Sequence, residues 1–433
     1  MSKEFIQIQK EIEAYPRFRK ASGFKAVKSL LKRIDYKDSI PMIHVVGTNG
    51  KGSVASMVGS ILGQHGLKVG LFTSPHLVDI RERMVVNGHL MTESDFVDSY
   101  QYLMSIVAEQ LSDGGERPTF FELMFLIAIL YFKKSKVDVM VMEAGIGGRL
   151  DTTNVLENRW LNIMTSISLD HTAILGGTIE AIVDEKAAII RPGMTTLVLD
   201  EDKTISQRIQ SIASNKMGNI VLVAPFDGTI LERDKESIDF SLDTKYYSYE
   251  RLRICSLADY QLDNAKLAIT AIHLLEDHLV VDPLKIAHGI SNFYWPGRME
   301  YITKDLLVDG AHNIAGMTNF VKHLNKYENK TITDLLFACM SDKDVEEMCG
   351  VIAKIEMIGT IYLPQLPYLR AVEPRVITQT MEKYGLKTIV VDNLYAFLDA
   401  RGSEVGARTL LGAVGSLYLV GAIKKYSGGL SND

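Results

Sequence analysis

Residues 44–62 read HVVGTNGKGSVASMVGSIL, an apolar run that passes through a glycine-rich turn into an amphipathic segment. Glycine lets a backbone fold closely around an anion, and the start of the next helix offers unpaired N–H groups and a positive dipole end. The common pattern G-x-x-x-x-G-K places its lysine further along than Lys51 lies from Gly47. The context still predicts a phosphate loop, with Lys51 on the terminal phosphates and Ser53 as a hydroxyl for Mg²⁺. The alternative is a glycine-rich turn with a surface lysine.

The alternation of apolar runs and helical patterns continues through the first half of the chain. Such alternation is typical of a parallel sheet covered on both faces, whose ligands bind at the carboxyl ends of the strands. Residues 195–257 change to shorter strand-like runs with many charges between them, which predicts a β-rich extension of this domain. The expected strands of the parallel sheet are 41–47, 68–74, 136–145 and 160–168.

Length and one hinge-like segment predict two domains. A chain of 433 residues exceeds the size at which a single core usually stops growing. The segment SNFYWPGRME (291–300) combines proline, glycine and aromatic residues after a helical pattern, and strand–helix alternation restarts beyond it. We therefore predict an α/β protein. Residues 1–296 form a phosphate-loop ATPase domain with a mostly parallel sheet, and residues 297–433 form a smaller Rossmann-like α/β domain.

Composition and charge exclude several classes of protein. The net charge of -6 leaves no excess of cations for a nucleic-acid partner. The most apolar run, 120–132, is too short to span a bilayer and contains Glu122, so it predicts a buried helix and no membrane partner. The start lacks the apolar core of a signal peptide. Three cysteines without metal-binding spacing fit a reducing cytoplasm. We expect a monomer, because the sequence shows no conspicuous oligomerisation signature.

Polar residues follow further strands of the expected sheet. Glu143 ends the strand in VDVMVMEAGIGG (137–148), and a carboxylate beside a phosphate loop suits Mg²⁺. Asp170 and His171 follow the strand at 160–168, and Lys186 lies on the helix after them. Glu143 could instead cap its strand, and a lone histidine or lysine is more often structural or solvated. These residues indicate only that several strand ends carry polar groups toward one edge.

The segment TSPHLVDIRERMVVNG (73–88) follows the second strand. Ser74 and His76 fall where the crevice is expected. Arg81 and Arg83 either face an anionic substrate or lie in solvent, and their spacing does not decide between the two.

The second domain repeats the pattern in LLVDGAHNIAG (306–316), where Asp309 and His312 end a strand. If both sheets point their carboxyl ends at one cleft, these residues contact the nucleotide and Arg298 reaches the phosphates from the hinge. Closure of the domains would then exclude water from a reactive intermediate.

Eight motifs in order give the sequence a resemblance to a known family. Between residues 40 and 420 they are GTNGKGS, TSPHL, GIGGRLDTTN, LDHTAILG, EKAAIIRPG, WPGRME, VDGAHN and GSLYL. This order resembles that of folylpolyglutamate synthases and dihydrofolate synthases, the folate branch of the Mur ligase superfamily. The resemblance implies an ATP-dependent ligase that phosphorylates a folate or dihydropteroate carboxylate. The amine of L-glutamate then attacks the acyl phosphate, giving amide, ADP and phosphate.

The resemblance also implies roles for individual residues. Lys51, Lys186 and His171 would be catalytic, and two Mg²⁺ ions would be held by Ser53, Ser74, Glu143, His171 and a carbamylated Lys186. Substrate contacts would come from His76, Arg83, Phe121, Asp151 and Thr152, the last three at the pterin end. ATP contacts would come from Asn49, Gly50, Lys51, Gly52, Ser53, Asn264, Arg298, Asp309 and His312.

Four positions depart from the family pattern: Thr152 and Ala188 replace its usual alanine and glycine, and Ile314 and Val414 replace proline and threonine. None removes an expected ligand. Whether the enzyme adds the first glutamate, extends a glutamate tail or does both stays open. The alternatives are a Mur-type amino-acid ligase acting on another carboxylate, and a phosphate-loop ATPase that acts on a protein partner.

Overall fold

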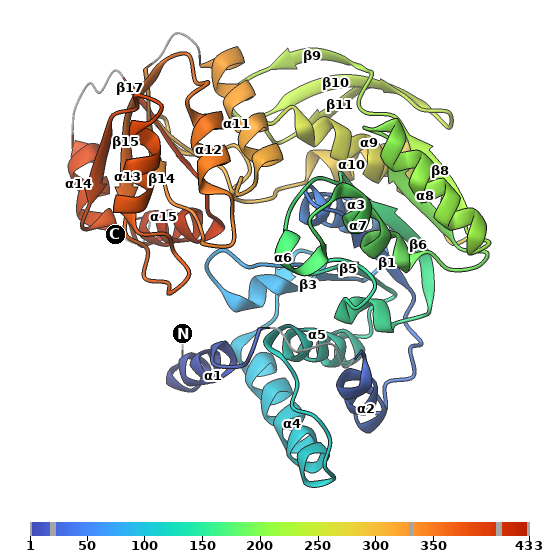
Figure 1. The fold of residues 1–433 in the computed structure, drawn as a ribbon. Helices are drawn as coiled ribbons and strands as arrows, with labels where there is room; N and C mark the ends of the chain where they lie inside the picture. The colour runs from blue at the N-terminus through green and yellow to red at the C-terminus, as the bar shows by residue number, and fades with distance from the viewer. Residues whose placement is uncertain (1, 18–22, 329–331, 404–408, 431–433) are drawn as a thin grey trace.

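The computed structural model describes residues 2–17, 23–328, 332–403 and 409–430. They form two α/β parts that lie side by side, with an antiparallel ribbon beside the first part (Figure 1). No helix in these ranges is long and apolar enough to cross a membrane. The predicted α/β fold class is confirmed. A large, mostly parallel sheet with its helices is followed by a separate, smaller sheet with helices of its own.

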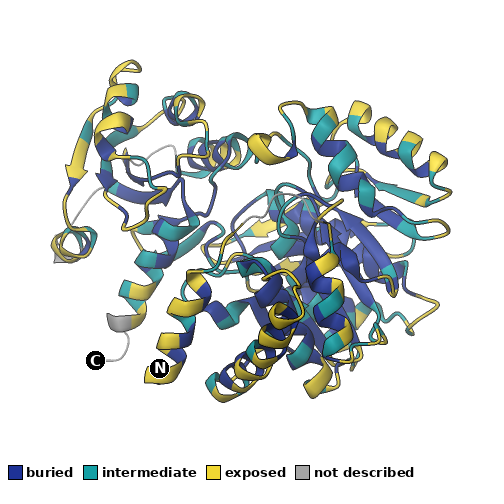
Figure 2. Cartoon of the chain, turned by 60° about the horizontal axis from the view of Figure 1, so that its bottom comes forward, coloured by how far each residue is buried: buried dark blue, intermediate teal, exposed yellow. Residues whose placement is uncertain are grey.

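The first sheet has eight strands in the order β4-β3-β2-β5-β1-β6-β7-β8. β1 (Met42–Val46) lies inside it, parallel to β5 (Val139–Glu143) and β6 (Arg159–Met164), and all five of its residues are buried. Figure 2 shows this sheet as the dark interior of the molecule. The remaining strands are β2 (Val69–Phe72), β3 (Met84–Val86), β4 (His89–Leu90), β7 (Thr195–Leu199) and β8 (Asn219–Val223).

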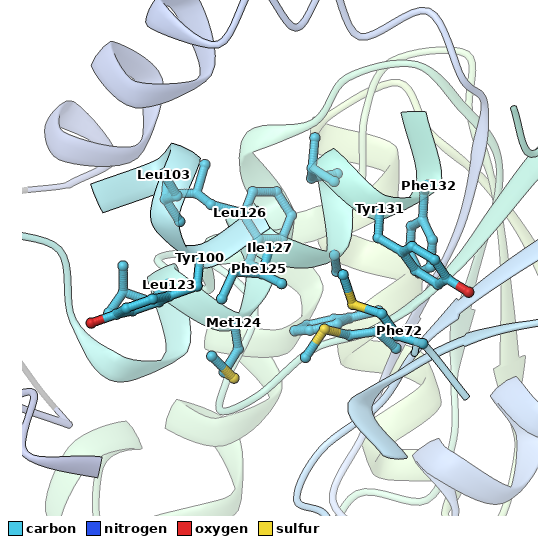
Figure 3. Close-up of a cluster of buried hydrophobic side chains, with 14 of the residues drawn as sticks. Phe72, Tyr100, Leu103, Leu123, Met124, Phe125, Leu126, Ile127, Tyr131 and Phe132 are labelled. Atoms are coloured by element: carbon cyan, nitrogen blue, oxygen red, sulfur yellow. The ribbon is translucent and has the colours of Figure 1, made fainter. Parts of the chain in front are cut away.

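Helices cover both faces of this sheet. On one face α3 (Lys51–Gln64) packs with α9 (Tyr260–His273) and α10 (Pro283–Ser291). On the other, α5 (Phe120–Ser135) lies within a core of aromatic and aliphatic side chains that includes Phe72 (Figure 3). The run at 120–132 therefore is the buried helix that the sequence predicts.

Thr119 and Glu122 form a capping box at the start of α5, since each side chain bonds the other residue's backbone N–H. The other helices of this part are α1 (Lys3–Glu13), α2 (Lys25–Arg33), α4 (Glu93–Ser112), α6 (Thr172–Leu175), α7 (Ile179–Lys186) and α8 (Lys203–Asn215). Short 3-10 turns span Ile80–Arg83, Thr152–Val155 and Ala187–Ile189.

The predicted β-rich extension is smaller than expected. β7 and β8 join the main sheet as parallel strands with α8 between them, so they continue the α/β pattern. Only β9 (Thr229–Arg233), β10 (Ile238–Asp243) and β11 (Ser248–Ile254) form a separate antiparallel sheet. The charges between these runs obscured the helix in the sequence.

The second α/β sheet has the order β12-β13-β17-β14-β15-β16. β12 is antiparallel to β13, and the other pairs are parallel. The strands are β12 (Glu300–Thr303), β13 (Leu306–Val308), β14 (Ile332–Phe337), β15 (Ile358–Pro364), β16 (Thr388–Val391) and β17 (Thr409–Val414). The helices are α11 (Ile314–Tyr327), α12 (Val345–Ile352), α13 (Pro374–Glu382), α14 (Leu394–Ser403) and α15 (Leu417–Leu430).

Candidate active site

A cavity of about 980 Å³ lies between the two α/β parts. Its walls come from the segments after β1, β2, β5 and β6 in the first sheet and after β13, β14 and β17 in the second. These are carboxyl ends of parallel strands, where α/β sheets bind ligands. The convergence of both sheets on one cavity is what the sequence pattern predicts.

The loop after β1 is fixed to the segment that follows β6. Thr165 Oγ1 donates to the Asn49 carbonyl at 2.6 Å, and Thr48 N donates to the Ser166 carbonyl at 2.7 Å. A Cβ on Gly47 would lie 1.9 Å from Thr165 Oγ1, so the close approach requires glycine. Gly50 has φ +82° and no side chain caps the helix there. The first N–H groups of α3 are thus left for an anion.

Lys51 and Ser53 occupy the first turn of α3. Lys51 Nζ donates to the Thr48 carbonyl at 3.0 Å and lies on the cavity. The buried Ser53 hydroxyl accepts from Gln261 Nε2 at 3.1 Å, and Gln261 Oε1 accepts from Asn264 at 2.8 Å. The α9 helix therefore supports the loop from behind.

Glu143 ends β5 next to this helix start. Its Oε2 accepts the backbone N–H of Ser74 at 2.8 Å, so the strand ends of β2 and β5 are tied together. Burial raises the pKa of the Glu143 carboxyl, while Lys51 and Arg298 counteract that rise. These neighbouring cations favour the ionised form of the carboxyl group, and an ionised carboxylate can bind a metal ion.

Lys186 lies beneath the phosphate loop. Its Nζ donates to the Gly47 carbonyl at 2.6 Å, and the residue is 3 % exposed. Burial, followed by repulsion from Lys51, lowers the pKa of Lys186 to about 7. A large share of neutral amine is therefore present near neutral pH.

An ionic cluster joins the two parts. Asp170 of the first pairs with Lys343 of the second, and Asn313 Nδ2 donates to Asp170 Oδ2 at 3.0 Å. Burial opposes ionisation of Asp170, but His171 and Lys343 hold its pKa below the usual range. Burial lowers the pKa of both His171 and His312 to about 4, so both imidazoles are neutral at pH 7.

Two further contacts reinforce this junction. The side-chain amides of Asn49 and Asn313 bond each other at 3.0 and 3.3 Å. Asp309 accepts from the Tyr260 hydroxyl and from the backbone of Met299 and Ala311, at 2.7 to 2.9 Å. The carboxylate of Asp309 therefore holds the hinge segment at Met299 against the end of β13, and it also lines the cavity.

The start of α5 and the segment after β5 supply another part of the cavity lining. Phe121 packs on the backbone of Gly145, and both Phe121 and Thr152 line the cavity. Asp151 Oδ1 accepts from the Thr153 hydroxyl at 2.7 Å, and that hydroxyl contacts His44 Nε2 at 2.7 Å. Asp151 also accepts the backbone N–H of Thr153 at 3.1 Å and that of Ile146 at 2.8 Å, so this carboxylate fixes the loop after β5 as well as lining the cavity.

Most of the residues singled out in the sequence meet at this cavity. Three stand outside its lining: His76 lies behind Arg83, whose Nε donates to His76 Nδ1 at 2.9 Å; Lys186 lies below the loop; and Arg81 pairs with Asp79 at 2.7 Å. Those that line it are Asn49, Gly50, Lys51, Gly52, Ser53, Ser74, Arg83, Phe121, Glu143, Asp151, Thr152, His171, Asn264, Arg298, Asp309 and His312.

Sequence reasoning missed several polar residues of the cavity, among them Arg17, Lys343, Arg370 and Tyr418. Arg17 follows α1 and precedes the strand alternation, so no pattern connects it with a strand end. Lys343 lies on the segment between β14 and α12, six residues after the strand ends at Phe337, and a search of the segments after each strand would have included it.

Fold and site together define a phosphate-loop enzyme whose chemistry takes place between two α/β domains. The chain belongs to the Mur ligase family. The model of the Mur ligase middle domain matches residues 45–272, and that of the Mur ligase glutamate ligase domain matches residues 297–417. The chain is accordingly a ligase.

Individual proteins show the same relationship. The chain is 29% identical to a dihydrofolate synthase/folylpolyglutamate synthase of Bacillus subtilis, over 93% of this chain and 94% of that protein. It is 29% identical to a probable bifunctional folylpolyglutamate synthase/dihydropteroate synthase of Haloferax volcanii, of which it spans about half, 48%. The structure of E. coli FolC in complex with DHPP and ADP superposes with a TM-score of 0.86 at 24% identity, covering 99% and 98% of the two chains.

Proposed function

We propose that this ligase joins the amine of L-glutamate to a carboxylate of folate or dihydropteroate, at the expense of ATP. The observation that carries the proposal is one cavity lined both by the loop of Lys51 and by Asp151 and Phe121. Relatives named as folate ligases, and a similar structure that holds ADP and DHPP, support it.

The reaction follows from the placement of the charges. The acceptor carboxylate attacks the γ-phosphorus of ATP and ADP leaves, while Lys51 and Arg298 neutralise the transferring phosphoryl group. The amine of glutamate then attacks the acyl carbon, loses a proton, and phosphate departs. Neutral His312 lines the cavity, and because its Nδ1 donates to the Gly310 carbonyl at 2.8 Å, its Nε2 can accept that proton.

The residues present fit Mg²⁺ at the loop. Ser53, Ser74 and Glu143 offer hard oxygen atoms on adjoining strand and helix ends, the donor type that Mg²⁺ prefers. The described residues contain no cluster of three or more His, Cys, Asp or Glu side chains that could hold a metal ion. The two serines and bound water would therefore complete the coordination of Mg²⁺. When bound, Mg²⁺ neutralises the charge of the phosphates.

A second Mg²⁺ fits only with a change at Lys186. As an ammonium, Lys186 donates to the Gly47 carbonyl and repels a cation. The depressed pKa leaves neutral amine that adds CO₂ to give a carbamate, an anion that could hold a second ion with His171. We propose this carbamylation together with the second ion.

Three predictions from the sequence remain proposals: a domain boundary at 296/297, a monomer and a cytoplasmic location. The two family matches end and begin on either side of that boundary. The three free cysteines support a reducing compartment.

The test is a glutamate-incorporation assay with dihydropteroate and tetrahydrofolate as acceptors. We expect ADP and amide to form in equal amounts only when ATP, glutamate and one of these acceptors are all present. ATP turnover without acceptor and glutamate would favour the phosphate-loop ATPase. If glutamate is incorporated into neither acceptor and ATP is not hydrolysed in their absence, the result would point to a Mur-type ligase for another carboxylate.

A further inference from the structure

The phosphate loop contains a glycine that its backbone conformation does not require. Gly52 is the second residue of α3, and its φ lies outside the left-handed region, so alanine would suit the helix better than glycine. A Cβ at this position would lie 2.7 Å from Trp295 Cζ2 and 3.3 Å from Glu143 Oε2. Gly52 therefore lies between an indole and a carboxylate that leave no room for a side chain.

Trp295 lies where the hinge segment (291–300) passes from one part of the molecule to the other. Its indole packs against the core of the first part. Two residues later, the Gly297 carbonyl accepts the backbone N–H of Gly310 at 2.8 Å, in the segment after β13. Glu300 then pairs with Lys424 of α15 at 2.6 Å. The hinge segment is thus anchored in the first part at Trp295 and in the second part from Gly297 onward.

This arrangement links the second part to the phosphate loop. Only Pro296 separates the two anchors, so a rotation of the second part about the hinge moves the backbone that carries Trp295. Among the described residues, those that line the cavity include Gly52 and not Trp295. The indole can therefore affect the loop only through Gly52, the neighbour of both Lys51 and Ser53.

We propose that Trp295 is a positioning residue for the phosphate loop. Its indole packs on Gly52 and holds the first turn of α3 against Glu143 while the two parts are closed over the cavity. Nucleotide binding at the loop and the orientation of the second part are coupled through this contact. The inference rests on the proposed ligase reaction for its kinetic effect, whereas nucleotide binding and the surroundings of the indole can be measured without any acceptor.

The first test is a double-mutant cycle in the full-length enzyme. Gly52→Ala displaces the indole and should raise the Kd for ADP with Mg²⁺, measured by titration calorimetry, and the KM for ATP about tenfold, within the range of coupling between residues in contact. Trp295→Ala should raise both through the lost packing. The double variant should bind ADP no more weakly than Trp295→Ala alone, because the new methyl group occupies space that the indole has left.

The matched control for this cycle is Gly63→Ala, in the last turn of the same helix. A Cβ added there meets no other segment of the described chain within 4 Å. Gly63→Ala should therefore change neither the Kd for ADP nor the KM for ATP. Trp295→Phe keeps a smaller ring over Gly52 and should retain most of the affinity that Trp295→Ala loses.

The second test uses the fluorescence of the indole. The chain has two tryptophans, Trp160 and Trp295, so Trp160→Phe leaves the hinge indole as the single emitter. Saturating ADP with Mg²⁺ should change the emission of Trp160→Phe and leave that of Trp295→Phe, the control, unchanged. This test keeps both Gly52 and Trp295, so it stands even if a substitution at the contact unfolds the chain.

Two results would overturn the proposal: costs that simply add in the double variant, and an emission that does not respond in a Trp160→Phe enzyme that calorimetry shows to bind ADP. The proposed function fails separately. Coupled costs and a responsive emission, in an enzyme that adds glutamate to no pteroyl acceptor, would refute that function and support the positioning role of Trp295.

Discussion

At the scale of single residues, Lys51 carries the phosphate-loop assignment. Its ammonium donates to the carbonyl of Thr48 in its own loop, which holds the charge at the start of α3. Lys51→Ala should lower kcat roughly 100-fold or more, the usual loss for a donor to a charged transition state. Steady-state ADP release measures this. Lys68→Ala, at an exposed lysine before β2, is the control, and near-normal turnover in Lys51→Ala would refute the loop.

Glu143 separates the metal role from a purely structural one. If its carboxylate holds Mg²⁺, Glu143→Ala should shift the Mg²⁺ titration of activity to much higher concentration. A residue that only ties Ser74 to the strand end would lower activity at every Mg²⁺ concentration without that shift. Glu157→Ala, at an exposed glutamate before β6, serves as the control.

Lys186 makes a prediction about pH. Its pKa of about 7 lies below the ordinary value for lysine, so the amine becomes neutral as pH rises through about 7. Carbamylation should therefore increase between about pH 6 and pH 8, and added bicarbonate should compensate at the lower pH. Intact-mass measurement under native conditions should show the mass of one CO₂, lost in Lys186→Ala. Metal-loaded enzyme without this mass would contradict the carbamate.

At the scale of elements, the start of α5 couples stability to the acceptor site. Thr119 caps this helix, and the first turn carries Phe120 and Phe121 into the cavity. Thr119→Ala should lower the free energy of unfolding by about 1 kcal/mol, measured by urea denaturation, and should raise the KM for the acceptor. Thr119→Ser keeps the cap and should restore both. Unchanged values in Thr119→Ala would show that packing alone holds the helix.

Elements also show what the sequence could predict. Strands β1, β2, β5 and β6 follow from continuous apolar runs, because a strand buried on both faces needs no alternation. The β3–β4 hairpin and β12 escaped notice, since short antiparallel edge strands leave little pattern. Site residues directly after strands could be found by position. Arg17 could not, because only the packed fold brings it to Tyr418.

At the scale of the molecule, the two parts are held closed over the cavity by polar side chains. Asn313 bonds both Asn49 and Asp170, so it connects the phosphate loop with the second sheet. Asn313→Ala should loosen closure and let water reach the acyl phosphate, so phosphate release should exceed amide formation. The ratio of the two products measures this. Asn325→Ala, whose bonds stay within the second part, should keep the ratio at one.

The central claim is that the phosphate loop delivers a phosphoryl group to the acceptor's carboxylate. Heavy-oxygen labelling of that carboxylate tests it most directly, with ATP and L-glutamate present and the released phosphate analysed by mass spectrometry. Transfer through an acyl phosphate predicts that each phosphate carries one labelled oxygen from the acceptor and that the amide keeps the other. Unlabelled phosphate, formed while amide accumulates, would contradict the account.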